Sequence, residues 1–104
     1  MLVYRVENAS GEGPYVSGAA NLLRKHNYCA NHPLIYEDNI ELRWGKDPRC
    51  GCVNLEALKK WFGEYLQTLL NLGYYIVEYS VSDSRVIVGK SGIQCGFDRY
   101  YASK

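Results

Sequence analysis

The chain has 104 residues, a formal net charge of +1, a hydrophobic fraction of 47% and a charged fraction of 22%. A chain of this length builds one hydrophobic core, and this composition excludes a disordered or collagen-like protein, so a single domain over residues 1–104 is expected. Acidic and basic residues are interspersed, whereas phosphate binding needs clustered Lys and Arg, so nucleic acid is not expected as a partner.

The first predicted element is a strand over Leu2–Glu7, in which the charged Arg5 stands among apolar residues. Such a residue either faces solvent or belongs to a binding site, and both interpretations stay open for Arg5. Residues 8–15 form a predicted turn region because they include Gly11, Gly13 and Pro14. Apolar residues at helical spacing then predict a short N-terminal helix over residues 18–26.

Residues 27–49 mix Asn, Pro, Asp and Gly with one short apolar patch at 34–36. This composition predicts a long ordered loop with at most one short strand. Loops of such length in compact domains are often functional.

The clearest helical pattern runs from Asn54 to Leu72. Asn54 is a favourable N-cap residue, apolar residues recur at the helical period, and Gly73 supplies a C-terminal stop. Gly63 stands in the middle of this main helical segment and is a point at which it can break into two pieces.

Three successive strands are predicted over residues 74–81, 85–89 and 92–97, joined by tight turns as an antiparallel meander. The last strand carries Gln94, a polar residue in an apolar run, which either faces solvent or belongs to a site with Arg5. The predicted fold is an α+β domain: a small, mostly antiparallel sheet with one main helical segment and a short N-terminal helix packed on it.

No charged-then-apolar signal region opens the sequence, and no apolar run approaches the roughly 20 residues that cross a bilayer. A cytoplasmic protein without a membrane partner is therefore expected. In that compartment the four cysteines, Cys29, Cys50, Cys52 and Cys95, are expected as free thiols.

A zinc site is one hypothesis for these thiols. The chain has enough imidazole and thiolate groups for a tetrahedral zinc, although a Cys-x-Cys spacing is tighter than that of the usual zinc knuckle. The candidate ligands are His26, Cys29, His32, Cys50 and Cys52. The alternative is that Cys50 and Cys52 are small apolar residues that enter the main helix. No known signature of a nucleophilic cysteine surrounds any of the four thiols.

Ten tyrosines are the compositional anomaly. Tyr combines a large apolar ring with a polar tip, so it is enriched at interfaces and ligand clefts, although strands favour it too. Tyr100 and Tyr101 follow the last predicted strand and are expected to be exposed.

The order of segments resembles a family of small proteins encoded by phages and prophages. The most specific part of the likeness is the run Cys50–Phe62, with its Leu-Glu-x-Leu-x-x-Trp-Phe pattern. The other parts are the strand Tyr4–Asn8, the loop Gly11–Tyr15, His32-Pro33 with an acid near Asp38, and the closing strand Ile93–Phe97. The likeness covers nearly the whole chain.

That family in turn is similar to a reduced ADP-ribosyltransferase, in which a first-strand Arg or His grips the nicotinamide-side ribose and a last-strand Glu or Gln completes the site. On this likeness Arg5 matches the first position and Gln94 the last. The chain has Gln rather than Glu at the last position, and Cys50-Gly51-Cys52 where Ser-Thr-Ser or Tyr is expected. Because a neutral amide stabilises an oxocarbenium-like state poorly, no catalytic residue is assigned.

The predicted ligand-binding residues are Arg5, Gly13, Tyr15, His32 and Gln94. The functional hypothesis is a phage- or prophage-encoded accessory protein without a cofactor. It would bind a host protein or protein complex in the host cytoplasm and inhibit a host defence system such as CRISPR. The alternative is a minimal ADP-ribosyltransferase that uses NAD at Arg5 and Gln94.

Overall fold

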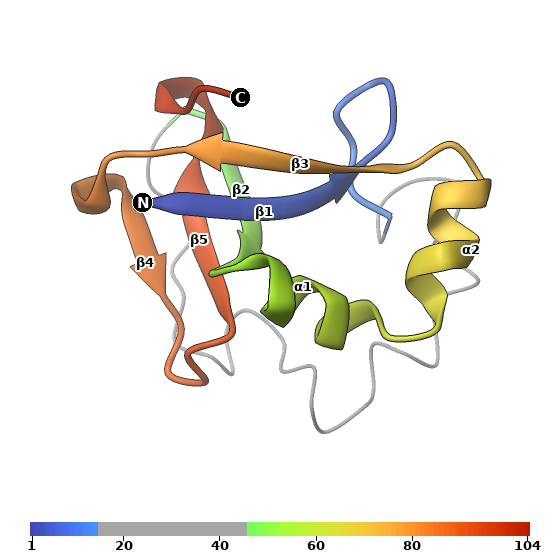
Figure 1. Ribbon diagram of the computed structural model, residues 1–104. Helices are drawn as coiled ribbons and strands as arrows, with labels where there is room; N and C mark the ends of the chain where they lie inside the picture. The colour runs from blue at the N-terminus through green and yellow to red at the C-terminus, as the bar shows by residue number, and fades with distance from the viewer. Residues whose placement is uncertain (15–45) are drawn as a thin grey trace.

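The described residues, 1–14 and 46–104, form a five-stranded antiparallel sheet with two α-helices in a computed structural model (Figure 1). The strands are β1 (Leu2–Glu7), β2 (Pro48–Cys52), β3 (Tyr75–Ser80), β4 (Val86–Val88) and β5 (Gln94–Asp98). The helices are α1 (Leu55–Phe62) and α2 (Tyr65–Asn71), and short 3-10 turns lie at Asp83–Arg85 and Arg99–Tyr101. The predicted α+β class with an antiparallel sheet is confirmed.

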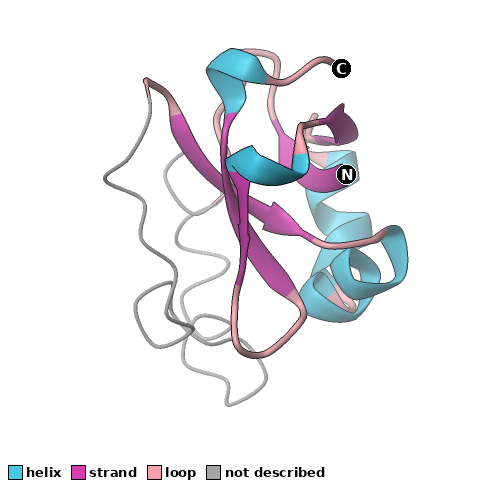
Figure 2. Ribbon diagram, turned by 90° about the vertical axis from the view of Figure 1, so that its left-hand side faces the viewer, coloured by secondary structure: helices cyan, strands magenta, loops and turns pink. Residues whose placement is uncertain are grey.

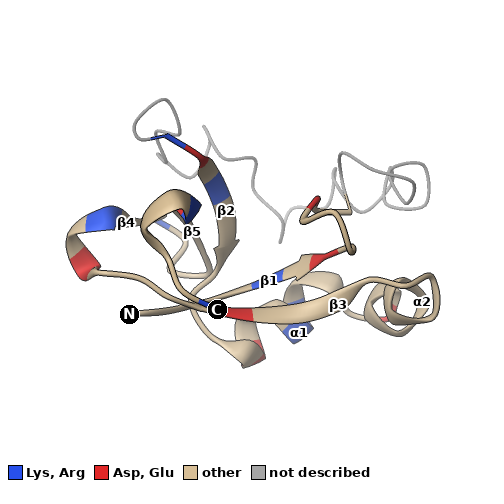
Figure 3. Ribbon diagram, turned by 90° about the horizontal axis from the view of Figure 1, so that it is seen from above, with Lys and Arg blue, Asp and Glu red and all other residues tan. Residues whose placement is uncertain are grey.

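The sheet consists of two groups of strands that meet between β1 and β2. Its strand order is β3-β1-β2-β5-β4. β1 pairs with β3 along its whole length, whereas the single pair Tyr4↔Cys52 joins β1 to β2. Seen from above, the β1–β3 pair and the β2–β5–β4 group diverge from this junction (Figure 3). A side chain of β1 can therefore reach across the opening between the two groups.

The close approach of β1 and β2 requires a glycine at position 51. A Cβ atom on Gly51 would lie 2.6 Å from Cγ1 of Val3 and 2.9 Å from the carbonyl oxygen of Tyr4. Glycine inside a strand often marks such a contact between backbones. Gly51 thus lets β2 lie against β1 at the only point where the two groups are paired in the described part of the chain.

The predicted main helical segment forms two helices. Oδ1 of Asn54 accepts a hydrogen bond from the backbone N–H of Ala57 at 2.7 Å, which caps α1 as expected. Gly63 has a φ of +53°, a conformation that favours glycine, and α1 ends there. The break that the sequence indicated at Gly63 is confirmed. Neither helix in the described ranges is long and apolar enough to span a bilayer.

Both faces of the sheet are packed, and α1 and α2 lie on the same side of it (Figure 2). Successive side chains of a strand point to opposite faces, so β1 supplies Val6 to one core and Val3 to the other. The core beneath the helices consists of Val6, Cys52, Leu58, Phe62, Leu69 and Tyr74. The core on the opposite face consists of Val3, Val77, Tyr79, Val81, Cys95 and Phe97.

The predicted meander of the last three strands is wrong. β4 and β5 pair with each other, but β3 pairs with β1 at the other edge of the sheet. The segment between β3 and β4 is a 3-10 turn at Asp83–Arg85 that crosses to the opposite edge rather than a tight hairpin turn. The alternation of apolar residues predicts a strand but contains no information about which strand lies beside it.

The strand β2 lies where the sequence predicted the end of a loop and the entry to a helix. Pro48 begins this strand, and Gly51 lies inside it, and both residues are typical breakers of strand patterns. Cys50 and Cys52 are thus strand residues, and the interpretation that they enter the helix is wrong. The short helix predicted over residues 18–26 and most of the predicted loop over 27–49 lie outside the described residues.

Asp98 holds the end of β5 to the segment that leads into β2. Its buried carboxylate accepts hydrogen bonds from the backbone N–H groups of Lys46, Asp47 and Tyr100 at 3.0–3.1 Å. Burial would raise the pKa of Asp98, but these three donors outweigh that effect and hold the pKa below its ordinary value. Folding therefore favours the ionised form of this side chain.

We expect Gly51→Ala to lower the free energy of unfolding by about 1–3 kcal/mol, because the added methyl group overpacks the β1–β2 contact. Urea titration of the purified protein measures this change. Cys50→Ala is the matched control, since it alters the neighbouring half-buried residue of the same strand and should cost less than about 1 kcal/mol. Equal stability of the Gly51→Ala variant and the native protein would contradict the proposed close approach.

We expect Asp98→Asn to lower the melting temperature at neutral pH. The pKa of Asp98 is lower in the folded protein than in the unfolded chain, where it is about 3.9. The ionised side chain therefore stabilises the fold above about pH 3.9, and this stabilisation is lost as the pH falls through the folded-state pKa. The difference in melting temperature between variant and native protein should thus shrink below about pH 4. Asp83→Asn, at an exposed carboxylate 3.0 Å from the N-terminal amine, is the control and should change little. A pH-independent effect of Asp98→Asn would refute this assignment.

Candidate functional site

A small cavity lies where β1 and β2 meet the helix α1. Its volume is about 70 Å³. Three of the five predicted ligand-binding residues, Arg5, Gly13 and Gln94, line it. The other two, Tyr15 and His32, lie outside the described residues. The structure therefore brings together the first-strand and last-strand residues that the sequence singled out, although they belong to strands separated by β2.

Strand register places Gln94 on the face of Tyr4, and Arg5 reaches the cavity at the opening between β1 and β2. Gln94 on β5 is paired with Cys52 on β2, and Cys52 is paired with Tyr4 on β1, so Gln94 lies two strands away from the residue before Arg5. Gln94 is buried, and the turn after β1 places Gly13 beside the guanidinium group, where a Cβ on Gly13 would lie 3.4 Å from Nη2 of Arg5. The rest of the wall is mainly apolar. It consists of Tyr4, Val6, Pro14, Cys50, Gly51, Cys52, Leu58, Trp61 and Phe62.

Arg5 forms a buried ion pair within its own strand. Its Nε lies 2.8 Å from Oε2 of Glu7, and the two side chains are 6% and 0% exposed. Nη1 of Arg5 donates to the carbonyl oxygen of Cys50 at 2.6 Å, across the opening between β1 and β2. Arg5 is therefore not the solvent-facing strand charge that one interpretation of the sequence expected. It neutralises a buried carboxylate and ties β1 to β2.

Glu7 is surrounded by further donors and cations. Oε2 of Glu7 accepts a hydrogen bond from the hydroxyl of Tyr79 at 2.7 Å. Nη1 of Arg99 lies 3.7 Å from the same oxygen, and Nζ of Lys104 lies 3.6 Å from Oε1. Burial, together with the bond to Glu7, raises the pKa of Tyr79 to about 12. Residues from β1, β3 and the C-terminal end of the chain thus converge on one carboxylate.

Sequence analysis did not identify Glu7 as a member of the site. One local signal was available, because Arg5 and Glu7 are two residues apart in a strand and so share a face of the sheet. No local pattern could predict the hydrogen bond from Tyr79 to Glu7, because Tyr79 lies 72 residues further along the chain. Leu58, Trp61 and Phe62 also line the cavity, although their spacing predicted only the packed face of a helix.

Burial favours the protonated form of two cysteines. Burial raises the pKa of Cys52 and of Cys95 to about 12, so both are protonated thiols at neutral pH. A protonated thiol is a poor nucleophile and a poor zinc ligand. Within residues 1–14 and 46–104, no three His, Cys, Asp or Glu side chains are grouped as a metal site would require. His26, Cys29 and His32 lie outside those ranges, and the zinc hypothesis for them stays a prediction.

The cavity has the chemistry of a small apolar recess. Pockets that hold drug-sized ligands measure about 300–1,000 Å³, several times the volume present here. No carboxylate is among the described residues that line it, and the charge of Arg5 is balanced by Glu7. The recess therefore offers shape, one buried amide side chain and the half-buried thiol of Cys50.

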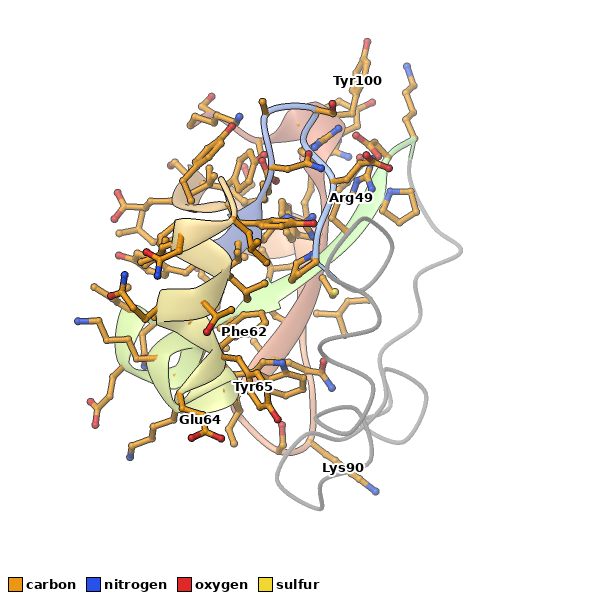
Figure 4. All side chains as sticks on the ribbon, turned by 90° about the vertical axis from the view of Figure 1, so that its right-hand side faces the viewer. Arg49, Phe62, Glu64, Tyr65, Lys90 and Tyr100 are labelled. Atoms are coloured by element: carbon orange, nitrogen blue, oxygen red, sulfur yellow. The ribbon has the colours of Figure 1, made fainter. Side chains whose placement is uncertain are left out.

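An aromatic surface lies at the opposite end of β5, in the turn Arg99–Tyr101. Tyr100 is 61% exposed and projects away from the sheet (Figure 4). Its ring lies 4.9 Å from the ring of Tyr101, measured between centroids, in an edge-to-face arrangement. Nζ of Lys46 lies 4.5 Å from the centroid of the Tyr100 ring, and the guanidinium of Arg85 lies 3.5 Å from that of Tyr101. The predicted exposure of Tyr100 and Tyr101 is confirmed.

Comparison with protein families gave a match over the whole chain. The model of a family described as Bacteriophage T4 Y00F protein matches residues 1–104. Neither the search of curated proteins nor that of solved structures produced a match. The expected likeness to phage-encoded proteins is therefore supported, whereas the likeness to an ADP-ribosyltransferase is not.

We expect Glu7→Gln to lower the free energy of unfolding by about 3–5 kcal/mol, because it leaves the charge of Arg5 buried without its counterion. Chemical denaturation followed by tryptophan fluorescence measures the change. Glu78→Gln is a matched control, because Glu78 also accepts a hydrogen bond from a tyrosine hydroxyl, that of Tyr4, but is exposed. The control should cost less than about 1 kcal/mol.

The double variant Arg5→Met, Glu7→Gln separates the ion pair from simple packing. If the two charges are coupled, the double variant loses less stability than the sum of the two single variants, by about 0.5–3 kcal/mol. Strict additivity of the two single effects would show that the charges do not interact.

Proposed function

The chain belongs to the bacteriophage T4 Y00F protein family, and we infer that it is a phage accessory protein. We propose that it acts by binding a host protein or protein complex in the cytoplasm of the infected cell. The observation that carries this proposal is the internal pairing of Arg5. The residue best suited to grip a small anionic ligand is bonded instead to Glu7 and to the carbonyl oxygen of Cys50. The chain thus uses its buried charges to hold the fold.

The surface supports a binding role. Leu72 is 59% exposed and Tyr75 is 40% exposed, at the point where the chain leaves α2 and enters β3. Tyr100 and Tyr101 are exposed at another part of the molecule, and each is packed against a basic side chain. Tyr is enriched at protein interfaces because its ring provides contact area at a low cost in conformational entropy. These residues are the contacts that a protein partner would use.

We include inhibition of a host defence system, such as CRISPR, in this proposal. An inhibitor of that kind needs only to occupy a surface that its target uses, and this requires neither a cofactor nor a catalytic group. A small rigid domain with exposed aromatic residues is suited to such a role. The family's phage origin supports this class of target, since a phage must act on host machinery.

The experiment that tests the proposal is affinity capture from host lysate with the tagged native protein and with the double variant Tyr100→Ser, Tyr101→Ser. A protein partner should be recovered in stoichiometric amount with the native protein. If the aromatic surface takes part, the double variant should recover at least about tenfold less, as for the loss of interface hot spots. Lys90→Ala, at an exposed residue of the β4–β5 turn, is the control for non-specific loss. Recovery of no stoichiometric partner would refute the binding function.

The alternative of a minimal ADP-ribosyltransferase rests on one observation, that Arg5 and Gln94 line the same cavity. It predicts that NAD raises the melting temperature of the native protein and that Gln94→Ala abolishes the increase, since a ligand stabilises the state that binds it. The small volume of the cavity and the paired state of Arg5 lead us to expect no increase. A thermal-shift titration with millimolar NAD decides between the two functions.

A further inference from the structure

The strand β3 forms the longer edge of the sheet. β3 and β4 are the two edge strands, with six and three residues respectively. An edge strand carries a row of backbone N–H and C=O groups that another chain can pair with, and proteins often protect such edges by keeping them short. β4 has that protection, whereas β3 is twice as long.

The ladder between β1 and β3 shows which groups of β3 point outward. Met1 and Val81 exchange two hydrogen bonds, the amine of Met1 to the oxygen of Val81 at 2.7 Å and the N–H of Val81 to the oxygen of Met1 at 2.9 Å. Bonded and non-bonded pairs alternate along an antiparallel ladder. The residues of β3 that are bonded to β1 are therefore Tyr79, Val77 and Tyr75. The intervening residues Ile76, Glu78 and Ser80 direct their backbone groups away from β1.

One of these three outward positions is already paired. Ser80 exchanges two backbone hydrogen bonds with Ser103, at 2.7 and 3.0 Å, in antiparallel orientation. In this register Lys104 lies opposite Tyr79, and its Nζ is 5.9 Å from the centroid of the Tyr79 ring. The C-terminal tail, Ser103 and Lys104, therefore lies on the outer edge of β3 as the beginning of a further strand. Among the described residues, the outward backbone groups of Ile76 and Glu78 have no backbone partner.

We propose that the β3 edge at Ile76 and Glu78 is the docking site for an extended segment of the host protein partner. The segment adds to the sheet antiparallel to β3 and in line with the C-terminal tail. This mode of recognition uses main-chain hydrogen bonds for affinity and alternate side chains for specificity. The inference rests on the proposed function, because it identifies how the same partner is held.

The side chains beside this edge indicate the chemistry of the segment. Glu78 is exposed, and the partner of its carboxylate among the described residues is the neutral hydroxyl of Tyr4, so its negative charge favours a basic residue opposite it. Ile76, two residues away on the same face, is packed against the core beneath the helices and favours an apolar residue opposite it. Tyr75, on the other face, offers an exposed ring to the next residue. Written in the same chain direction as the tail, the segment therefore has a basic residue opposite Glu78, then any residue, then an apolar residue opposite Ile76. A β-branched or aromatic residue follows opposite Tyr75.

The C-terminal tail also argues against a second copy of this chain as the occupant. Two antiparallel copies of β3 can pair Ile76 with Glu78 of the other copy only if Tyr79 faces the second Tyr75. Lys104 already fills that position beside Tyr79. Shifting the register in one direction would require the N–H of Tyr74, which donates to the oxygen of Leu69 at 3.0 Å, and shifting it in the other direction would require the backbone groups of Ser80, which are bonded to Ser103. An extended peptide has none of these conflicts.

The test uses proline to remove one outward N–H from each edge of the sheet. Glu78→Pro removes an outward donor of β3 and leaves the backbone bonds to β1 in place, although the side-chain bond from the Tyr4 hydroxyl is also lost. Val88→Pro is the matched control on β4, where the bond from the N–H of Gly89 to Gln94 at 2.9 Å makes the N–H of Val88 point outward. Glu78→Lys keeps the backbone intact and reverses the charge. The probes are random short peptides displayed on yeast, selected for binding to each variant of the full chain.

We expect the native protein and Val88→Pro to enrich peptides with a basic residue two positions before an apolar one. These peptides should slow hydrogen exchange at the amides of Ile76 and Glu78. Glu78→Pro should lower the affinity for these peptides about tenfold or more, because the edge hydrogen bond from residue 78 and the adjacent backbone bonds are lost. Glu78→Lys should enrich acidic residues at the first position, which tests the proposal even if the proline variant does not fold. Equal binding to Glu78→Pro, no enrichment, or dimerisation of the native protein through β3 would overturn the proposal.

Affinity capture from host lysate with the same variants separates this proposal from the proposed function. A partner recovered equally by the native protein and by Glu78→Pro would preserve the binding function and refute the β3 site. Recovery of the partner by the native protein and Val88→Pro but not by Glu78→Pro supports both. Absence of a partner with every variant would refute the binding function itself.

Discussion

The buried carboxylate of Glu7 is the point on which the architecture of this domain depends. Arg5 pairs with it and simultaneously holds the carbonyl oxygen of Cys50 on β2. The hydroxyl of Tyr79 brings β3 to the same oxygen. Arg99 and Lys104 add the end of the chain. Because β1 and β2 share a single residue pair, the bonds of this network add to the hydrophobic core in joining the two groups of strands on that face. A charge buried here is stable only while its partners stay in place.

The same network limits what the candidate site can do. A guanidinium that already neutralises a buried carboxylate would have to give up that partner before it could hold a nucleotide. Such an exchange would cost the free energy of breaking a buried ion pair, about 3–5 kcal/mol. The protonated thiols of Cys52 and Cys95 add no nucleophile. The interior of the described domain is therefore organised for stability, and the binding function that we propose uses its outer surface.

That surface has two distinct parts. The ring pair Tyr100 and Tyr101 is held by Lys46 and Arg85, so these aromatic side chains are partly ordered before any partner arrives. The edge of β3 offers directional backbone groups instead, and the strand that we propose to add there takes its register from the tail at Ser103. Ordering contact groups in advance reduces the entropy that binding must overcome. A phage protein of this size can thus present rigid contacts without a large interface scaffold.

The sequence by itself determined the α+β class, the N-cap at Asn54, the break at Gly63 and the exposure of Tyr100 and Tyr101. These features depend on the local conformational preferences of a few neighbouring residues, so a local pattern contains them. The polar residues Arg5 and Gln94 in otherwise apolar strands also suggested a shared site, with a solvent-facing position as the alternative, and both residues line the cavity. Only the tertiary structure decided that β3 lies beside β1 instead of β5, that residues 48–52 form a strand, and that Arg5 is paired internally. Strand partners and buried charges are selected by contacts between distant residues, such as Glu7 and Tyr79, and no local pattern records which distant residue will supply the contact.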